Sequence, residues 1–402
     1  MHHIKVSNFG PIIECDMDIN KFNVLTGPQA SGKSTIAKAI YFFRTIKNDI
    51  LDLILKNKTR QPLKEVLKDH LTQKLRSLYD RFTNDFILKY IYGEDSFVEI
   101  SLNQFDKEIF KFGGKIEKFL DCKNKLPYNV NDDAINSLSE ELNDLFNDDM
   151  ETVYIPAGRI TISLLSEQLT PVFFSMDDTQ RRTIDYSFWK YFELVLKIRP
   201  YFEKINIRYK GMAGFYKKII KAEYKYENLQ ERLYFNDDDY IILNFASSGQ
   251  QEAVWILNIL NYFYAENKKI FLVVEEPEAH LYPEAQMHMT DALALFVNGG
   301  GNSGLIATHS PYILGEFNNL ILCGQASHDG IDKKDIKEAS DADERAWFKK
   351  GTLQAFHAIN GKCENALTES GLIMNELIEG ASEKIDDRCS GLIDLFHGEG
   401  NK

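Results

Sequence analysis

Long apolar runs are absent from this sequence. Its purely apolar stretches, such as residues 270–274 and 292–297, are far shorter than the roughly 20 residues that span a bilayer, so we expect no membrane helix. The start, from Met1 to Lys5, lacks the apolar segment of a secretory signal. The 5 cysteines are odd in number and lack the spacing of a zinc site, so the sequence predicts a reduced, cytoplasmic protein.

An excess of positive charge is also absent. The 402 residues include 47 Lys+Arg and 60 Asp+Glu, a net charge of -13, which excludes a surface that is basic throughout. With 44% hydrophobic and 27% charged residues, 10 Pro and 24 Gly, the composition is that of a globular chain. The length suits two or three domains, or one elaborated domain with insertions.

Periodicity divides the chain into α/β and helical parts. Apolar runs around a turn at residues 8–11, followed by the run 22–25, predict a hairpin and a buried strand. Residues 45–92 place apolar side chains three and four apart and are expected to be helical, whereas residues 97–120 alternate like strands. Further expectations are a short helix in an acidic, solvated stretch (129–151), a strand (152–155) followed by helices, a small antiparallel sheet (209–243) and a polar C-terminal segment.

A glycine-rich pattern, G-x-x-x-x-G-K-S, occupies residues 27–34. It follows the apolar run 22–25 and precedes a helical pattern, which is the context of a phosphate-binding loop. Backbone N–H groups would cradle the phosphates, Lys33 would reach the β- and γ-phosphates, and the Ser34 hydroxyl would bind Mg²⁺. The alternative, a glycine turn with an incidental lysine, is disfavoured by the flanking strand and helix. The expected nucleotide-binding residues here are Gly27, Pro28, Gln29, Ala30, Ser31, Gly32, Lys33, Ser34 and Thr35.

Two glutamates, Glu275 and Glu276, follow the apolar run 270–274. A buried strand that ends in acids is how a parallel sheet places carboxylates beside a bound phosphate. Glu275 would complete the Mg²⁺ shell, and Glu276 would be the catalytic residue that polarises the attacking water. In isolation, a core strand ending in a solvated loop explains this pattern equally well, but the phosphate loop favours a site.

Two further segments follow in the order that such a site needs. His309 comes after the short strand 304–307 and would contact a γ-phosphate as a third catalytic side chain, although a lone histidine is more often structural. A turn of small residues opens an apolar helix, and its N-terminus suits an anion, although in isolation it is merely an N-cap. The members of this turn, which we expect to bind nucleotide, are Ser247, Ser248, Gly249 and Gln250.

The order of these motifs resembles the ABC-type ATPase heads of the OLD, RecF and SMC group. Residues 4–12, 154–159 and 275–284 are similar to the OLD-like AAA ATPases in particular. The resemblance implies an α/β fold, that of a P-loop NTPase with an ABC-type ATPase head carrying helical and small β insertions, and it implies ATP and Mg²⁺ as cofactors. It also implies a homodimer or higher oligomer with composite ATP sites, in which Ser247 and Gly249 of one subunit contact the γ-phosphate held by another.

The sequence departs from the family pattern at two motif positions. Glu275 stands where the family usually has aspartate, and its extra methylene would shift the metal shell and slow hydrolysis. Ser248 stands where the signature usually has a first glycine. Arg159 falls in roughly the region of the glutamine that couples metal to lobe movement in transporter ATPases, and we expect it to bind nucleotide.

The expected domain organisation follows the motifs. It consists of the N-terminal part of the ATPase head (residues 1–44), a mainly helical insertion lobe (45–150), a second lobe with helices and a small sheet (151–240), the C-terminal part of the head (241–325) and a C-terminal extension (326–402).

Three functions fit an ATPase of this group, and we expect the first. It is the sensor or switch subunit of a prokaryotic anti-phage defence complex, similar to the ATPase halves of Septu and PARIS, that controls a separate effector protein such as a nuclease. The second is a DNA repair or recombination ATPase like RecF; residues 188–233, rich in basic and aromatic side chains, leave nucleic-acid binding open. The third, an ATPase and nuclease in one chain, is disfavoured because the late acidic pair Asp341 and Asp343 follows no apolar run. A transporter subunit does not suit the insertion at residues 45–150.

Overall fold

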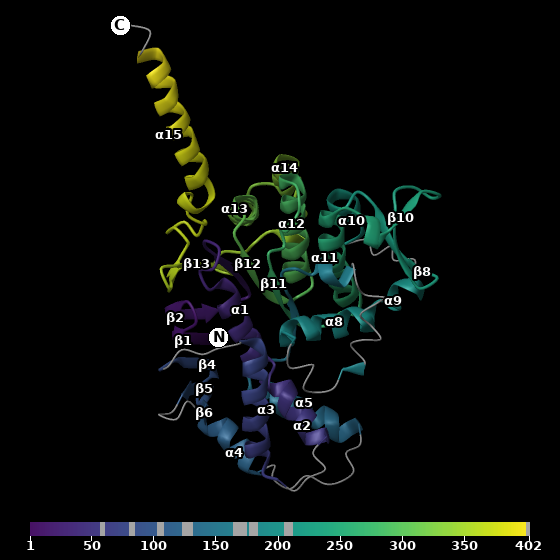
Figure 1. Ribbon diagram of the computed structural model, residues 1–402, viewed down its shortest axis with the longest axis vertical. Coiled ribbons are helices and arrows are strands. Elements are labelled where there is room, and N and C mark those ends of the chain that lie inside the picture. Colours follow the sequence, from purple (N-terminus) through teal and green to yellow (C-terminus); the bar gives the residue numbers. More distant parts are fainter. Residues whose placement is uncertain are drawn as a thin grey trace.

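One large sheet organises the computed structural model, which describes residues 1–56, 61–79, 85–102, 108–122, 132–163, 175–176, 184–204 and 212–398 (Figure 1). The five neighbouring strands at one end of this sheet pair in parallel. The other strands form both parallel and antiparallel pairs. The strand order is β6 (Glu108–Phe112), β5 (Ser96–Leu102), β4 (Ile87–Gly93), β1 (His2–Phe9), β2 (Ile12–Ile19), β14 (Lys362–Asn365), β13 (Leu353–Ile359), β3 (Phe22–Thr26), β12 (Ser303–Thr308), β11 (Ile270–Glu275) and β7 (Glu151–Ile155).

Helices cover both faces of the parallel part, which explains why β3 and β11 are buried along their whole length. One hydrophobic cluster joins the sheet to α1 (Lys33–Arg44), α2 (Ile46–Lys56) and α3 (Leu63–Leu78). A second cluster joins the opposite face to α11 (Ser248–Ala265), α12 (Pro283–Gly299) and α13 (Pro311–His328). The other helices are α4 (Gly114–Cys122), α5 (Asp132–Leu145), α8 (Tyr186–Ile198), α9 (Tyr201–Lys204), α10 (Ala213–Ile219), α14 (Lys333–Ser340) and α15 (Glu376–Gly398), with short 3-10 turns at η1 (Leu243–Phe245) and η2 (Glu344–Ala346).

The insertion after α1 contains strands as well as helices. The helical prediction for residues 45–92 is confirmed in α2 and α3 but is wrong at β4. There Leu88, Tyr90 and Tyr92 are buried at alternate positions, which is the period of a strand. The alternation expected over residues 97–120 is confirmed in β5 and β6, but the end of that stretch forms α4. The insertion, expected to be mainly helical, thus combines helices with strands that extend the sheet beyond β1.

The C-terminal hairpin, β13 and β14, lies in the middle of the sheet, although the sequence predicts only an extension there. β13 pairs in parallel with β3, and His357 lies opposite Thr26. At the hairpin turn, the carbonyl oxygen of Gly361 accepts hydrogen bonds from the backbone N–H groups of Ile13 (2.7 Å) and Glu14 (3.0 Å). The expected domain organisation divides the chain into five segments, and each of them thus contributes at least one strand to the large sheet.

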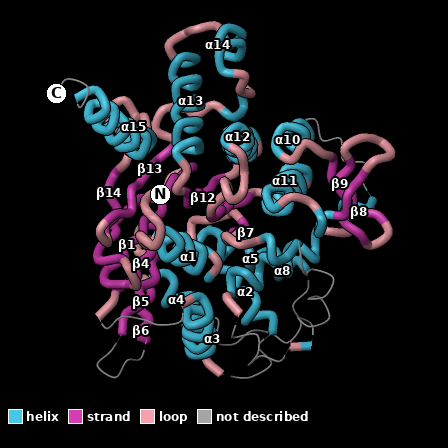
Figure 2. The backbone as a smooth tube through the Cα atoms, turned by 45° about the horizontal axis from the view of Figure 1, so that its top comes forward, coloured by secondary structure: helices cyan, strands magenta, loops and turns pink. Residues whose placement is uncertain are grey.

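Two elements stand apart from the large sheet. The expected small antiparallel sheet is confirmed as β8 (Glu223–Glu227), β9 (Gln230–Tyr234) and β10 (Tyr240–Ile242), next to α10 in Figure 2. Helix α15 begins against α13 and then extends away from the body (Figures 1 and 2). Beyond the first turns of α15, the side chains of Ile385 and Leu392 are exposed.

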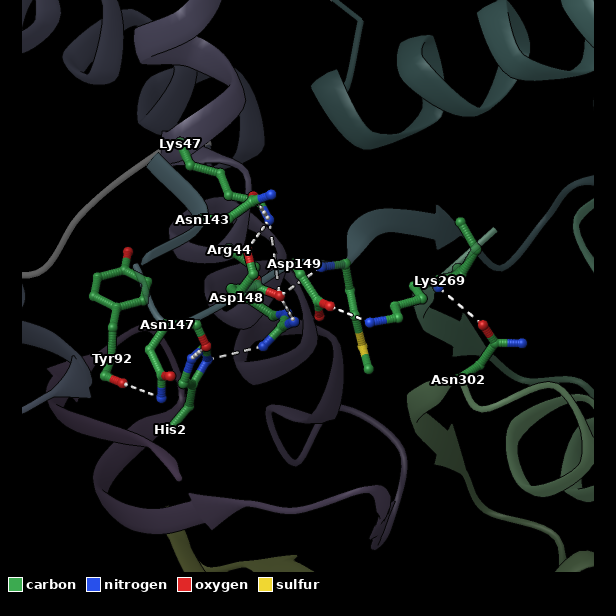
Figure 3. Close-up of polar contacts among 12 residues, drawn as sticks. His2, Arg44, Lys47, Tyr92, Asn143, Asn147, Asp148, Asp149, Lys269 and Asn302 are labelled. Carbon is green, nitrogen blue, oxygen red and sulfur yellow. Dashed lines mark hydrogen bonds and ion pairs between the residues drawn. The ribbon is translucent and has the colours of Figure 1, made fainter. Parts of the chain in front are cut away.

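A buried ionic cluster fixes the C-terminal end of α1 (Figure 3). Arg44 pairs with Asp148 at 2.9 Å, contacts the Nδ1 atom of His2 at 2.9 Å and lies 3.8 Å above the ring of Phe271. Lys47 donates to the backbone carbonyl of Asp148. Since β7 begins three residues after Asp148, the helix that starts at the phosphate loop is tied at its far end to the edge strand of the sheet.

Candidate active site

The phosphate loop joins β3 to α1, as the sequence predicts. Gly27 (φ 146°) and Gly32 (φ 99°) have backbone conformations that favour glycine. A Cβ atom at Gly27 would lie 2.2 Å from the carbonyl oxygen of Ala358, and one at Gly32 would lie 2.3 Å from the Cδ1 atom of Ile12. The loop is therefore shaped both by its own backbone and by the β1–β2 and β13–β14 hairpins packed against it.

Lys33 folds back onto its own loop. Its Nζ atom donates to the carbonyl oxygens of Gly27 (2.8 Å) and Pro28 (2.7 Å). An ammonium group held by neutral carbonyls can exchange them for phosphate oxygens, which form stronger, charge-assisted hydrogen bonds. Burial lowers the pKa of Lys33, and this effect is opposed by the negative charges of three carboxylates, those of Glu276, Glu278 and Glu275.

The carboxyl group of Glu275 lies at the end of β11 and is buried. Its Oε2 atom accepts a hydrogen bond from the backbone N–H of Ala157 (3.2 Å), and the buried Tyr154 hydroxyl is a polar neighbour whose pKa is raised by burial and by the Glu275 charge. No well-aligned hydrogen bond reaches the Oε1 atom within the described ranges, so a ligand that pairs with this oxygen would stabilise the buried carboxylate. With the exposed hydroxyl residue Ser34, Glu275 offers the oxygen donors that Mg²⁺ prefers. The residues present thus fit the expected metal.

Glu276 and His309 come together at the carboxyl ends of β11 and β12. Glu276 has φ 43°, and its side chain turns out of the strand and is partly exposed. The Nδ1 atom of His309 lies 3.9 Å from Oε1 of Glu276 and 3.4 Å from Oε1 of Glu278. Sequence reasoning assigned no role to Glu278; the only signal was a third acid close behind the expected pair.

The expected signature turn opens α11 and forms a capping box. The Ser247 hydroxyl accepts from the backbone N–H of Gln250, and the Gln250 side chain accepts in return from the backbone N–H of Ser247 at 3.1 Å. The Gln250 amide also donates to the carbonyl oxygen of Ile220 (2.8 Å), so this side chain is occupied within its own subunit. Ser247 and Ser248 are exposed. Gly249 packs so closely on the segment after β11 that a Cβ atom would lie 2.5 Å from the carbonyl oxygen of His280.

Arg159 has a different place from the one expected. Its side chain is 0% exposed and donates to the carbonyl oxygens of Pro156 (3.1 Å), Glu275 (2.9 Å) and Glu276 (2.8 Å). Its Nε atom lies 3.1 Å from a carboxylate oxygen of Glu252. Because these protein groups occupy the guanidinium, Arg159 holds the backbone that carries the two acids, and the expected nucleotide contact stays a prediction.

Neighbouring strands bring the main site residues to one edge of the sheet. β3, β12 and β11 are adjacent and parallel, so the phosphate loop, His309 and the two acids all leave the same edge. Such an edge can hold a nucleoside triphosphate with its phosphates against the N-terminus of α1 and its terminal phosphate beside acids and an imidazole. The polar contacts of the signature turn are made within its own cap and with Ile220, at the end of α10 in the second lobe.

None of the helices in the described part of the chain has the length and apolar character needed to cross a bilayer.

Comparison with known proteins identifies the family of this chain. No curated protein matches the chain. Among solved structures, an Smc head bound to the C-winged helix domain of ScpA is similar with a TM-score of 0.42 and 10% identity, over 90% of this chain and 95% of that chain. The SMC head domain from Thermotoga maritima gives a TM-score of 0.41 and 11% identity, over 91% of this chain and 98% of that chain. The AAA ATPase domain model matches residues 1–314, and the chain therefore belongs to that family of ATPases.

Proposed function

We propose that this ATPase binds Mg-ATP at the carboxyl edge of β3, β12 and β11 and hydrolyses it there. The observation that carries the proposal is that the phosphate loop with Lys33, the two acids and His309 leave the same edge of three adjacent parallel strands. Lys33 would bind the β- and γ-phosphates, and Ser34 and Glu275 would hold Mg²⁺, which supplies charge neutralisation when bound. Glu276 would orient and polarise the attacking water, and His309 would contact the γ-phosphate.

The sites are proposed to be composite, with the signature turn of a second copy closing over each nucleotide. Support comes from exposed aromatic side chains beside the motifs: Phe245 (75% exposed) precedes the signature, Tyr282 (77%) follows the acids, and Tyr312 (50%) follows His309. Large aromatic side chains left in water are typical of protein interfaces. In the dimer, Ser247 and Gly249 would contact the γ-phosphate held by the partner copy.

The biological role proposed is that of a cytoplasmic sensor or switch subunit in a prokaryotic anti-phage defence complex, whose nucleotide state controls a separate effector such as a nuclease. Support comes from the similarity of residues 154–159 and 275–284 to OLD-like ATPases. The late acidic pair serves local structure, because Asp343 caps η2 and pairs with Arg345 at 2.8 Å, while Asp341 ends α14. This placement supports assigning nuclease chemistry to another protein.

A DNA repair or recombination role is the second candidate, favoured by one surface feature. A cavity of about 360 Å³ beside the small sheet is lined by three lysines and two aromatic residues, and also by the acids Glu223, which pairs with Lys217 at 3.1 Å, and Asp237. Lys225 lies 4.1 Å above the ring of Tyr234, an arrangement that suits phosphates and stacked bases. The three lysines and two aromatic residues that line the cavity are Lys217, Lys221, Lys225, Tyr234 and Phe235. Arg208, Tyr209 and Lys210 of the same basic stretch lie outside the described residues.

The test measures ATP turnover, nucleotide affinity and molecular mass of the full chain with and without Mg-ATP. Lys33→Ala is expected to abolish nucleotide binding, and Glu276→Gln to retain ATP, to lower turnover by about 100-fold or more and to accumulate a dimer or larger assembly. Lys384→Ala, in exposed α15, is the matched control. Unchanged binding and assembly in both site variants would contradict the proposed site, and strong stimulation of turnover by duplex DNA would favour the repair role.

A further inference from the structure

Two cysteine side chains lie next to each other where the C-terminal hairpin meets the N-terminal one. β14 pairs in parallel with β2, with Lys362 opposite Glu14, so the following residues of the two strands, Cys363 and Cys15, are neighbours as well. Their side chains lie on the same face of the sheet, because Cys15 belongs to the hydrophobic cluster that joins the sheet to α1 and Cys363 packs against that cluster. Both thiols are free.

The two thiols differ in their access to solvent. Cys15 is buried, whereas Cys363 is half-buried. The neighbouring Cys363 thiol, together with burial, raises the pKa of Cys15. A buried thiol with a raised pKa is a poor nucleophile towards reagents in solution. An oxidant that arrives from solvent would therefore react first at Cys363, with Cys15 beside it as the second thiol.

The cysteine pair also lies one strand away from the contact that shapes the phosphate loop. On the other side of β14, Ala358 of β13 is directly opposite Cys363. The carbonyl oxygen of Ala358 is the atom that a Cβ at Gly27 would meet at 2.2 Å. A covalent bond between β2 and β14 would therefore restrain the hairpin whose other strand packs against the first glycine of the loop.

We propose that Cys15 and Cys363 form an oxidation site, at which a hydroperoxide joins them in a reversible disulfide that ties the two hairpins together and restrains the phosphate loop. Thiol pairs that react in this way in reducing compartments form transient, redox-sensing bonds. The site and its effect on the loop are independent of whether ATP is hydrolysed.

The reaction balances with one molecule of hydrogen peroxide. The Cys363 sulfur attacks one peroxide oxygen, the O–O bond breaks, and the leaving hydroxide takes up the thiol proton as water, which leaves a sulfenic acid at Cys363. The Cys15 sulfur then attacks the sulfur of Cys363, an S–S bond forms, and the departing hydroxide takes up the Cys15 proton as a second water. Two thiols lose two electrons to the peroxide. The second step is intramolecular, so proximity offsets the weak acidity of Cys15.

Peptide mapping of the full chain tests the bond. Tryptic peptides 6–21 and 363–384 contain Cys15 and Cys363, respectively, as their only cysteine. After hydrogen peroxide treatment and blocking of the remaining thiols, the two peptides are expected to appear joined, two hydrogen masses below the sum of the separate peptides. Dithiothreitol should separate them again.

Cys122 and Cys389 are internal controls. Both are exposed, and they belong to α4 and α15, which lie at opposite ends of the molecule in Figure 1. Peroxide should oxidise both without joining them within one molecule. If Cys122 and Cys389 are oxidised while peptides 6–21 and 363–384 remain separate, the oxidation site does not exist.

Hydrogen exchange tests the restraint on the phosphate loop. Oxidation of the wild type should slow amide exchange in residues 27–34 by about 3-fold or more, because local opening of the loop from β13 becomes rarer. Oxidation of Cys363→Ser should leave this exchange unchanged, and Cys15→Ala replaces that variant if it does not fold. A joined peptide pair with unaltered exchange in the loop would overturn the restraint. These readouts involve no nucleotide, so they are separate from the tests of ATP binding with Lys33→Ala and Glu276→Gln.

Discussion

The guanidinium of Arg159 donates a 2.8 Å hydrogen bond to the carbonyl oxygen of Glu276 and thereby holds the backbone of the acid proposed to polarise water. The same group reaches the carbonyl of Glu275 and pairs with the buried carboxylate of Glu252. An arginine wholly inside the protein thus connects the loop after β7, the end of β11 and the helix that begins with the signature.

Removing this arginine should affect both stability and turnover. Arg159→Ala leaves Glu252 as a buried, unpaired charge and is expected to lower the free energy of unfolding by about 3–5 kcal/mol. Arg159→Lys keeps the charge but cannot reach all three carbonyls, so turnover should fall while nucleotide affinity remains. Chemical unfolding and steady-state ATP hydrolysis check these outcomes. Arg345→Ala, which breaks an exposed pair, should cost about 1 kcal/mol or less; equal losses in both alanine variants would contradict the role given to Arg159.

Gly249 should tolerate no side chain. In Gly249→Ala, the new Cβ atom meets the carbonyl oxygen of His280 at 2.5 Å, so the start of α11 or the loop after β11 must move. We expect a loss of about 1–3 kcal/mol in stability and a loss of ATP-dependent assembly, measured by light scattering of the full chain. Gly214→Ala is the control, because nothing lies within 4 Å of a Cβ atom there. If Gly249→Ala assembles with ATP as the wild type does, the signature turn does not form a composite site.

Truncations should distinguish the contribution of the C-terminal hairpin to stability from that of the last helix. A chain ending at residue 382 keeps Leu377 and Ile378, which pack against the core, and should unfold thermally within a few degrees of the full chain. A chain ending at residue 340 loses β13, exposes the side of β3 that it covers and should be insoluble or unfolded. Circular dichroism and thermal melts distinguish these cases. A soluble, nucleotide-binding chain of 340 residues would show that β13 is dispensable.

His2 should make stability depend on pH. Burial, reinforced by the charge of Arg44, lowers its pKa to about 4. Because the unfolded chain has the higher pKa of about 6.5, it binds the proton more tightly, so stability is complete above about pH 6.5 and falls as the pH drops towards 4, by up to about 3 kcal/mol. In His2→Asn the denaturation midpoint should vary less between pH 7.5 and 4.5, whereas exposed His328→Asn should match the wild type. An identical pH dependence in all three proteins would refute the assignment.

Much of the site follows from sequence because its signals are local. The phosphate loop, Glu275, Glu276 and His309 each follow a short apolar strand, and parallel strands deliver their ends to one edge. The burial of Arg159 and its hydrogen-bond partners could not be predicted, because they are tertiary properties that its local sequence does not contain. The position of Glu278 was missed for the same reason, since its contacts are with Thr308 and His309, some 30 residues away.

The fold was less predictable where strands come late or lie at an edge. β13 mixes buried alanines with half-buried polar side chains, so its pattern is weak, and only pairing with β3 reveals it as part of the central sheet. β4 follows a strongly periodic helix, and its own alternation is short enough to be read as a continuation of that helix.

The position of β13 also sets an order of events during synthesis. The phosphate loop leaves the ribosome long before β13, the strand beside β3, which is encoded only at residues 353–359. A nascent chain therefore carries a complete nucleotide-binding motif without the neighbours that give the loop its shape. Newly made protein should therefore acquire ATP affinity only after β13 has emerged, so translation products that stop before residue 353 would not consume ATP.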